Sequence, residues 1–226
     1  MTELASHSTD YGVVESEPPE VMERNLRIAS QLWSSATVFF FFAFLFAYFY
    51  LRSLNEQHLW HPRAVKAPVA MGTLITVLVV ASALVAYAAA RRLGSGDQRA
   101  WRMGGLLALV LGLAAIAAQV VEWASLGFGP TQGGFASVFL GWTGLYWLFL
   151  IASLFWLETL VATSFRYAGP GGSGHAPGDA SGDAEREGDD IARPISLIPA
   201  GANAFAFYWA VLAAVGVATW LILYVL

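Results

Sequence analysis

Long apolar stretches alternate with short polar segments along most of this chain. Five of the stretches are long enough to cross a bilayer as helices, which takes about 20 residues each. They lie near Ser30–Leu51, Ala67–Ala90, Met103–Leu126, Phe135–Thr163 and Asn203–Leu226. Helices are expected because the bilayer interior offers no partner to an unpaired backbone amide. The pattern predicts an all-α integral membrane protein, a bundle of five transmembrane helices.

The polar segments divide the chain into a tail, a membrane domain and one long loop. Residues 1–29 form an acidic tail without the basic start and apolar core of a secretory signal, so we expect the tail to stay in the mature protein. Residues 30–226 form the membrane domain. Within it, 166–202 is predicted to be a flexible loop, because Gly169–Asp190 is too rich in Gly, Ser, Asp, Glu and Pro to build a core.

The basic residues predict the orientation of the spans. A cytoplasmic N-terminus places nine of the twelve basic residues inside: Arg24, Arg27, Arg91, Arg92, Arg99, Arg102, Arg166, Arg186 and Arg193. Arg52, Arg63 and Lys66 then lie outside. Because cytoplasmic loops carry an excess of Lys and Arg, we expect the N-terminus and the loop between spans four and five in the cytoplasm, and the C-terminus outside.

The composition excludes several kinds of chemical site. Hydrophobic residues make up 57% of the chain and charged residues only 12%, and there is no cysteine. Disulfides, thiolate metal sites and cysteine nucleophiles are therefore excluded. All four histidines (His7, His58, His61, His175) fall in predicted tails or loops, whereas a membrane haem needs imidazoles inside the helices. His58 and His61 are three apart, but two loop histidines are a weak metal signal. We expect no cofactor in this chain and no nucleic-acid partner.

Two acids, Glu122 and Glu158, lie inside predicted spans, and an intramembrane acid is a candidate functional residue. Each lies one to one and a half turns from its helix end, where a carboxylate can reach headgroups or water. Gln119 is three residues before Glu122 and shares its helix face, so the pair can act together on a neighbouring helix or a lipid headgroup. We favour a structural clamp over a proton relay. Glu158 is expected to bond a neighbouring helix or water.

Other features concern helix contacts and anchoring. Gly104, Ala108 and Gly112 form one small-residue stripe, and Ala206, Ala210, Ala214 and Ala218 form another; such stripes permit close approach of helices, although alanine is common in apolar helices. Tryptophans near the predicted span ends are expected to anchor at the membrane interface: Trp33, Trp60, Trp101 and Trp123.

Several motifs together resemble the five-helix form of haem–copper oxidase (cytochrome c oxidase) subunit III. The first span contains Leu32-Trp33-Ser34-Ser35-Ala36-Thr37 followed by four phenylalanines, Phe39–Phe42, and runs on to Tyr48–Arg52. The third ends Gln119-Val120-Val121-Glu122-Trp123, similar to the family's Gln-x-x-Glu-aromatic pattern. The fourth carries Thr143-Gly144 and the last Tyr208-Trp209 and Tyr224. The resemblance covers Ser30–Leu226.

The chain departs from the family pattern at several polar positions. The usual glutamate of the first span is Ala36, the family's histidines are replaced by Tyr146 and Phe149, and its final His and Asp are replaced by Ala210 and Ala213. The resemblance therefore indicates a divergent member, and the departures put in doubt any role of those groups in lipid anchoring or proton supply.

The resemblance implies an accessory, non-redox subunit of a respiratory haem–copper oxygen reductase in a prokaryotic cytoplasmic (inner) membrane. Subunits I and II would be the partners and would carry the haems and copper, and this chain would hold phospholipid between its helices and support proton supply. The candidates for lipid or partner binding are Gln119, Glu122, Trp123, Trp33 and Trp209, and the structural polar candidates are Glu158 and Thr143.

Two alternatives stay open. An accessory subunit of a nitric oxide reductase system would have a similar helix pattern and would differ in its partner. A small transporter or channel belongs to a different class, and the chain lacks the internal repeats, mid-membrane ionisable residues and Gly/Pro-broken helices that typify transporters.

Overall fold

The computed structural model describes residues 18–54, 60, 66–166 and 184–226, and every regular element among them is helical. The helices are α1 (Pro19–Ser53), α2 (Val69–Gly94), α3 (Gln98–Ser125), α4 (Gly134–Arg166) and α5 (Ala184–Trp220), and a short π-helix, η1 (Leu221–Val225), continues α5. Five helices in the described part are long and apolar enough to cross a membrane. The predicted five-helix, all-α architecture is confirmed.

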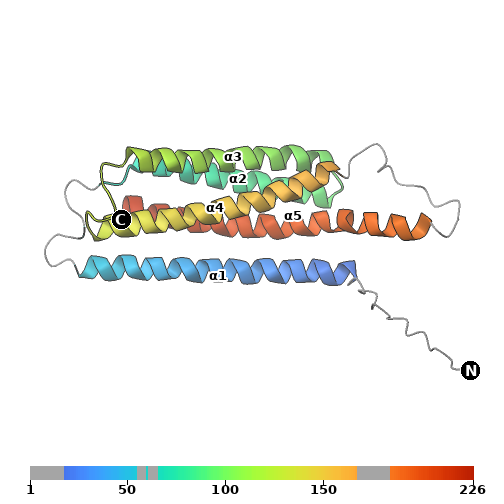
Figure 1. Cartoon of the computed structure of the whole chain (residues 1–226), viewed down its shortest axis with the longest axis horizontal. Coiled ribbons are helices and arrows are strands. Elements are labelled where there is room, and N and C mark those ends of the chain that lie inside the picture. The colour runs from blue at the N-terminus through green and yellow to red at the C-terminus, as the bar shows by residue number, and fades with distance from the viewer. Residues whose placement is uncertain (1–17, 55–59, 61–65, 167–183) are drawn as a thin grey trace, which may run out of the picture.

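Successive helices alternate in direction (Figure 1). α2 and α3 pack side by side, and α5 contacts α1, α2 and α4, so it is the central helix of the bundle. α1 lies along the edge opposite α2 and α3 and packs on α5 and α4 rather than mainly on α2, its neighbour in sequence. This arrangement leaves much of α1 uncovered: the side chain of Phe39 is 75% exposed.

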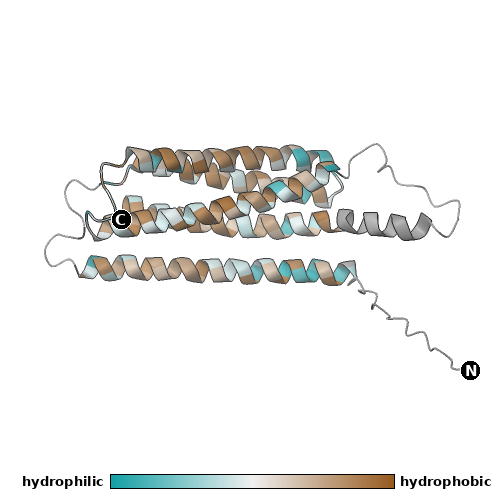
Figure 2. Cartoon of the chain, in the orientation of Figure 1, coloured by the Kyte–Doolittle hydropathy of each residue, from teal (hydrophilic) through white to brown (hydrophobic). Residues whose placement is uncertain are grey.

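Two helices extend beyond the predicted spans. α1 begins at Pro19 instead of Ser30, inside the predicted tail, and at 35 residues it is about 50 Å long, against about 30 Å for the hydrocarbon core. Its start is favourable because Pro19 occupies the first turn, where proline costs no hydrogen bond, and Glu20 faces the positive end of the helix dipole. Figure 2 shows hydrophilic residues gathered toward this end of α1.

The predicted flexible loop 166–202 is wrong in its second half. α5 begins at Ala184, so 184–202 is helical, while 167–183 lies outside the described residues. The segment that opens α5 includes Glu185 and Glu187.

Small residues of α3 provide close contacts with two neighbouring helices. A Cβ on Gly104 would lie 2.6 Å from the Ala89 Cβ of α2, and one on Gly112 would lie 2.5 Å from Leu154 of α4. Ala108 is fully buried, and its carbonyl accepts a 2.7 Å hydrogen bond from the Ser82 hydroxyl of α2. The predicted α3 stripe therefore packs on both neighbours. The α5 stripe does not behave in the same way, because Ala206 is buried whereas Ala210, Ala214 and Ala218 are exposed.

The turn between α2 and α3 is built by two residues. Gly96 adopts a positive φ of 89°, a conformation that glycine takes without steric cost. Asp97 caps α3 by accepting a 2.9 Å hydrogen bond from the Ala100 backbone N–H. Ser95 in this turn and Gln132, before α4, are both exposed and lie at opposite ends of the bundle.

These two positions allow a direct test of the predicted orientation, because a chain without cysteine has no background labelling. With a cytoplasmic N-terminus, Gln132→Cys is expected to react with a membrane-impermeant maleimide added to whole cells, and Ser95→Cys is not. In inverted vesicles the two reactivities should exchange. Labelling of Ser95→Cys on whole cells, with Gln132→Cys protected, would mean that the orientation is reversed.

Candidate functional site

A buried polar cluster joins the end of α3 to the end of the chain. Glu122 is fully buried, and Gln119, one turn earlier, is nearly so. The Gln119 Nε2 donates to Glu122 Oε2 at 2.5 Å, and the Tyr224 hydroxyl lies 2.8 and 2.9 Å from the two carboxylate oxygens. The carboxyl group of Glu122 therefore meets two donors, one on its own helix and one 102 residues away.

Tyr224 reaches this position because of its surroundings. It lies in η1, where the Leu226 N–H bonds to the Leu221 carbonyl with the wider π-helical spacing. Its ring makes an edge contact with Phe139 of α4, at 5.4 Å between centroids. A Cβ on Gly72 of α2 would lie only 2.4 Å from the same ring. Four elements therefore position one hydroxyl on Glu122.

The predicted partnership of Gln119 and Glu122 is present, and its third member is Tyr224. The pair acts on a neighbouring helix and not on a headgroup, because Glu122 has no exposed surface. The expectation that this carboxylate reaches headgroups or water from its place near the helix end does not hold in this conformation. The sequence signal for Tyr224 was weak, because a tyrosine near the end of an apolar span is also expected as an interface anchor.

Trp123 and Thr143 form a second contact between α3 and α4. The Trp123 indole N–H donates to the Thr143 hydroxyl at 3.1 Å, and that hydroxyl donates to the Phe139 carbonyl at 2.7 Å. The Trp123 ring also meets the Trp147 ring at 5.5 Å between centroids. Thr143 is buried, which agrees with its predicted structural role, and the indole nitrogen of Trp123 is used inside the chain.

The other candidates separate into exposed and buried groups. Trp33 is 59% exposed and Glu158 is exposed on α4, whereas Trp209 is fully buried. The Trp209 indole N–H donates to the Ser82 hydroxyl at 3.1 Å, so this residue joins α5 to α2 instead of facing lipid or a partner. Trp60 and Trp101, predicted as interface anchors, are also buried.

The positions that depart from the family pattern are filled in different ways. Tyr146 is buried and donates to the Leu212 carbonyl of α5 at 3.1 Å, next to Gly216, where a Cβ would collide with its hydroxyl. Phe149 packs on the rings of Phe40 and Phe41. The three remaining positions are alanines, which have no polar side-chain atom. Ala36 and Ala210 are exposed, and Ala213 is buried. Tyr146 thus forms a hydrogen bond that joins α4 to α5.

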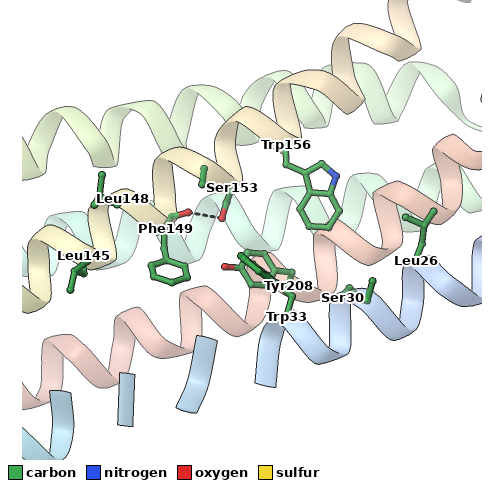
Figure 3. A pocket seen from close by; sticks show the side chains of 11 residues that line it. Leu26, Ser30, Trp33, Leu145, Leu148, Phe149, Ser153, Trp156 and Tyr208 are labelled. Carbon is green, nitrogen blue, oxygen red and sulfur yellow. Dashed lines mark hydrogen bonds between the residues drawn. The ribbon is translucent and has the colours of Figure 1, made fainter. Parts of the chain in front are cut away.

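An apolar cavity of about 600 Å³ lies between α1, α4 and α5 (Figure 3). The hydroxyl groups that line it are already engaged within the protein. The Ser30 hydroxyl donates to the Arg27 carbonyl, the Ser153 hydroxyl to the Phe149 carbonyl, and the Tyr208 hydroxyl lies 3.4 Å from that of Thr37. The rest of the lining is hydrocarbon and aromatic: Leu26, Ala29, Trp33, Leu145, Leu148, Phe149, Ala152 and Trp156. Such a surface suits an apolar chain.

The described residues contain no cluster of three or more His, Asp or Glu side chains able to hold a metal ion. His58 and His61, the weak metal candidates, lie outside the described residues, as do His7 and His175. The chemistry that the described polar groups can perform is hydrogen bonding between helices and, at Glu122, proton binding.

Comparison with known families assigns the fold. The model of the family described as "Cytochrome c oxidase subunit III" matches residues 10–169, which is most of the chain. The chain belongs to the cytochrome c oxidase subunit III family. A relative named "Cytochrome c oxidase subunit 3" from Thermostichus vulcanus is 28% identical over 102 residues, covering 45% of this chain and 50% of the relative. The match thus spans about half the length of that relative.

The segment that matches the subunit III family contains only part of the site. The matched segment contains Gln119, Glu122 and the α1 and α4 walls of the apolar cavity. α5 lies beyond it, and with it Tyr208 and Tyr224. The partner of Glu122 is therefore identified by the structure and not by the family match.

Proposed function

We propose that this chain is the accessory, non-redox subunit of a respiratory haem–copper oxygen reductase in a prokaryotic cytoplasmic membrane. The observation that carries the proposal is the subunit III family match over 10–169, together with five helices in the described residues that are long and apolar enough to span a membrane. In this function the partners are the catalytic subunit I and the copper-bearing subunit II, which reduce oxygen. The present chain packs beside them and supports proton-coupled electron transfer.

The polar cluster fits a supporting role. Glu122, Gln119 and Tyr224 tie α3 to the end of α5, and Ser82 with Trp209 ties α2 to α5. α5 already contacts most of the bundle. These bonds keep the bundle in one arrangement, which a subunit needs if its outer surface is to match a partner. In this function Glu122 is a clamp within the subunit.

The experiment that tests the proposed function is purification of the tagged chain from its native membrane in mild detergent. A haem spectrum, copper and oxygen-reducing activity are expected in the purified material. The same chain expressed alone is expected to be colourless, because its sequence lacks cysteine and has no histidine inside the predicted spans. Stoichiometric haem in the isolated chain would contradict the non-redox role, and nitric oxide reduction without oxygen reduction would identify the other respiratory partner.

We also propose that the apolar cavity between α1 and α4 holds a lipid acyl chain. Most of its lining is hydrocarbon or aromatic, and the hydroxyl groups that line it are already engaged in hydrogen bonds. The aromatic rings of Trp33, Phe149 and Trp156 provide a rigid wall for hydrocarbon. This lining supports the proposal that the cavity holds a lipid chain.

Filling the cavity is expected to release lipid. Ala152→Trp adds an indole to the cavity wall and should reduce the phospholipid retained by the purified complex by about one molecule per chain, because the volume is then occupied. Ala114→Trp places the same ring on the exposed side of α3 and is the matched control. Native mass spectrometry measures the retained lipid. Equal retention in both variants would contradict the assignment of the cavity.

A further inference from the structure

An acidic side chain, that of Glu158, is exposed on the outside of the bundle partway along α4. The other acids with described side chains outside the buried cluster lie near helix starts. Glu20 and Glu23 are in the first two turns of α1, and Asp97 caps α3. Glu158 therefore differs from them in its position along the helix, and its depth in the membrane decides what it can bind.

Contacts between α4 and α3 give the level of Glu158 in the bundle. Leu154 precedes it by one turn, and a Cβ on Gly112 of α3 would lie 2.5 Å from the Leu154 side chain. Val161 follows it by one turn, and a Cβ on Gly105 would lie 2.5 Å from the Val161 side chain. Glu158 is therefore level with the middle of the segment 105–112 of α3.

This level lies inside the hydrocarbon region. Ala108, within that segment, accepts the hydrogen bond from Ser82 of α2. Ser82 is nine residues before Arg91, and Ala108 is nine residues after Arg99, which corresponds to about 13 Å along each helix. Arginines near helix ends are expected at headgroup level, so Glu158 lies about 13 Å below it, too far for its short side chain to reach.

Glu158 has no hydrogen bond or ion pair among the described residues. The nearest hydroxyls on its own helix are already used: that of Thr159 donates to the Trp156 carbonyl at 2.7 Å, and that of Thr163 to the Thr159 carbonyl at 2.6 Å. An acid at this depth without a partner is costly, and such residues usually pair with another group. The missing partner must therefore come from outside the described part of the chain.

The side chains around Glu158 form a row that suits one helix. Its members recur at alternating intervals of four and three residues and are all exposed: Ile151, Phe155, Glu158, Ala162 and Phe165. An alternation of three and four is the spacing by which one helix packs along another at a shallow crossing angle. The small Ala162 and the acid interrupt an otherwise apolar row, which gives a second helix both a place of close approach and a polar contact.

We infer that this row binds one transmembrane helix of another protein subunit, with an arginine or lysine of that helix against Glu158. A second copy of this chain docked by the same row would bring two carboxylates together, which disfavours a symmetric pair. A lipid headgroup would have to descend about 13 Å into the hydrocarbon to meet the acid. The inference rests on the depth and exposure of Glu158 and does not depend on the proposed function.

The test uses photochemical cross-linking in the native membrane. Benzoylphenylalanine replaces Phe155, which lies on the same row one turn before Glu158 and is 66% exposed. The matched control carries the same group in place of Leu107 on α3, which is 51% exposed. Illumination is expected to join position 155, and not position 107, to a transmembrane segment that contains an arginine or lysine. Mass spectrometry identifies the joined segment.

Dependence on charge is tested in the same cross-linkable chain. Glu158→Gln is expected to lower the yield of the product about 10-fold, because it removes the charge, whereas Glu20→Gln, which neutralises another exposed acid, should not. Neutralising the basic residue of the joined segment should give the same loss, with no further loss when both changes are combined. The chain itself is expected to stay in the complex with its melting temperature unchanged, since Glu158 makes no contact within the bundle.

A product that depends on Glu158 and on a basic residue of a membrane helix supports the inference. A product with a second copy of this chain, a product with lipid alone, an equal yield in Glu158→Gln, or no product at position 155 overturns it. The haem content of the same membranes tests the proposed function separately. Haem present without the cross-link defeats only the inference, and the cross-link without haem defeats only the proposed function.

Discussion

Replacing Glu122 with leucine is expected to loosen the subunit. The substitution removes the acceptor for the Gln119 amide and the Tyr224 hydroxyl in a site without solvent access. Leaving a buried donor unpaired costs about 1–3 kcal/mol, and two donors lose their partner here. We expect a lower melting temperature and less of this chain retained by the complex after detergent washing. Glu158→Leu, which removes an exposed acid of α4, is the matched control and should change neither.

Glu122→Gln distinguishes a clamp from a proton relay. Glutamine keeps an oxygen that accepts from Tyr224 and removes the charge, so a clamp predicts that assembly and most of the oxygen-reduction rate survive. A proton relay predicts that Glu122→Gln and Glu122→Leu impair proton-coupled turnover alike, while the subunit stays bound to the complex. Turnover and subunit retention are measured for both variants. Loss of turnover in Glu122→Gln with full retention would rule out a purely structural clamp.

Gly72→Val is expected to be the second strongly disruptive change, although Gly72 makes no hydrogen bond to Glu122. Any Cβ at this position would lie 2.4 Å from the Tyr224 ring, which also packs against Phe139. Overpacking typically costs about 1–3 kcal/mol, and displacing the ring also withdraws its hydroxyl from the carboxyl group. Thermal unfolding of the purified complex should show the loss.

Whether Gly72→Val acts by displacing the Tyr224 ring is tested by combining two substitutions. In a Tyr224→Leu background, the added cost of Gly72→Val should fall by about half or more, because the ring that it displaces is absent. Gly144→Val on α4 is the control, since no atom lies within 4 Å of a Cβ built there. Full additivity of the two substitutions would show that Gly72 acts through some contact other than Tyr224.

The sequence by itself determined the five spans and the pairing of Gln119 with Glu122. Hydropathy locates spans well because a bilayer requires an apolar length of defined size, and residues three apart share a helix face whatever surrounds them. The motifs in the first, third and fourth spans indicated the subunit III family, and the family match over residues 10–169 confirms that membership. The orientation of the bundle stays a prediction from the charge pattern.

Boundaries and partners required the tertiary structure. Hydropathy detects the apolar part of a helix, so it missed the polar turns by which α1 starts at Pro19 and α5 at Ala184. The burial of Glu122 and Trp209 depends on which helices meet, and these contacts join residues more than 100 positions apart. Tyr224 reaches Glu122 because a third helix has a glycine at position 72 and a fourth supplies the ring of Phe139. A periodicity within one helix carries no information about such a meeting, because packing between helices decides it.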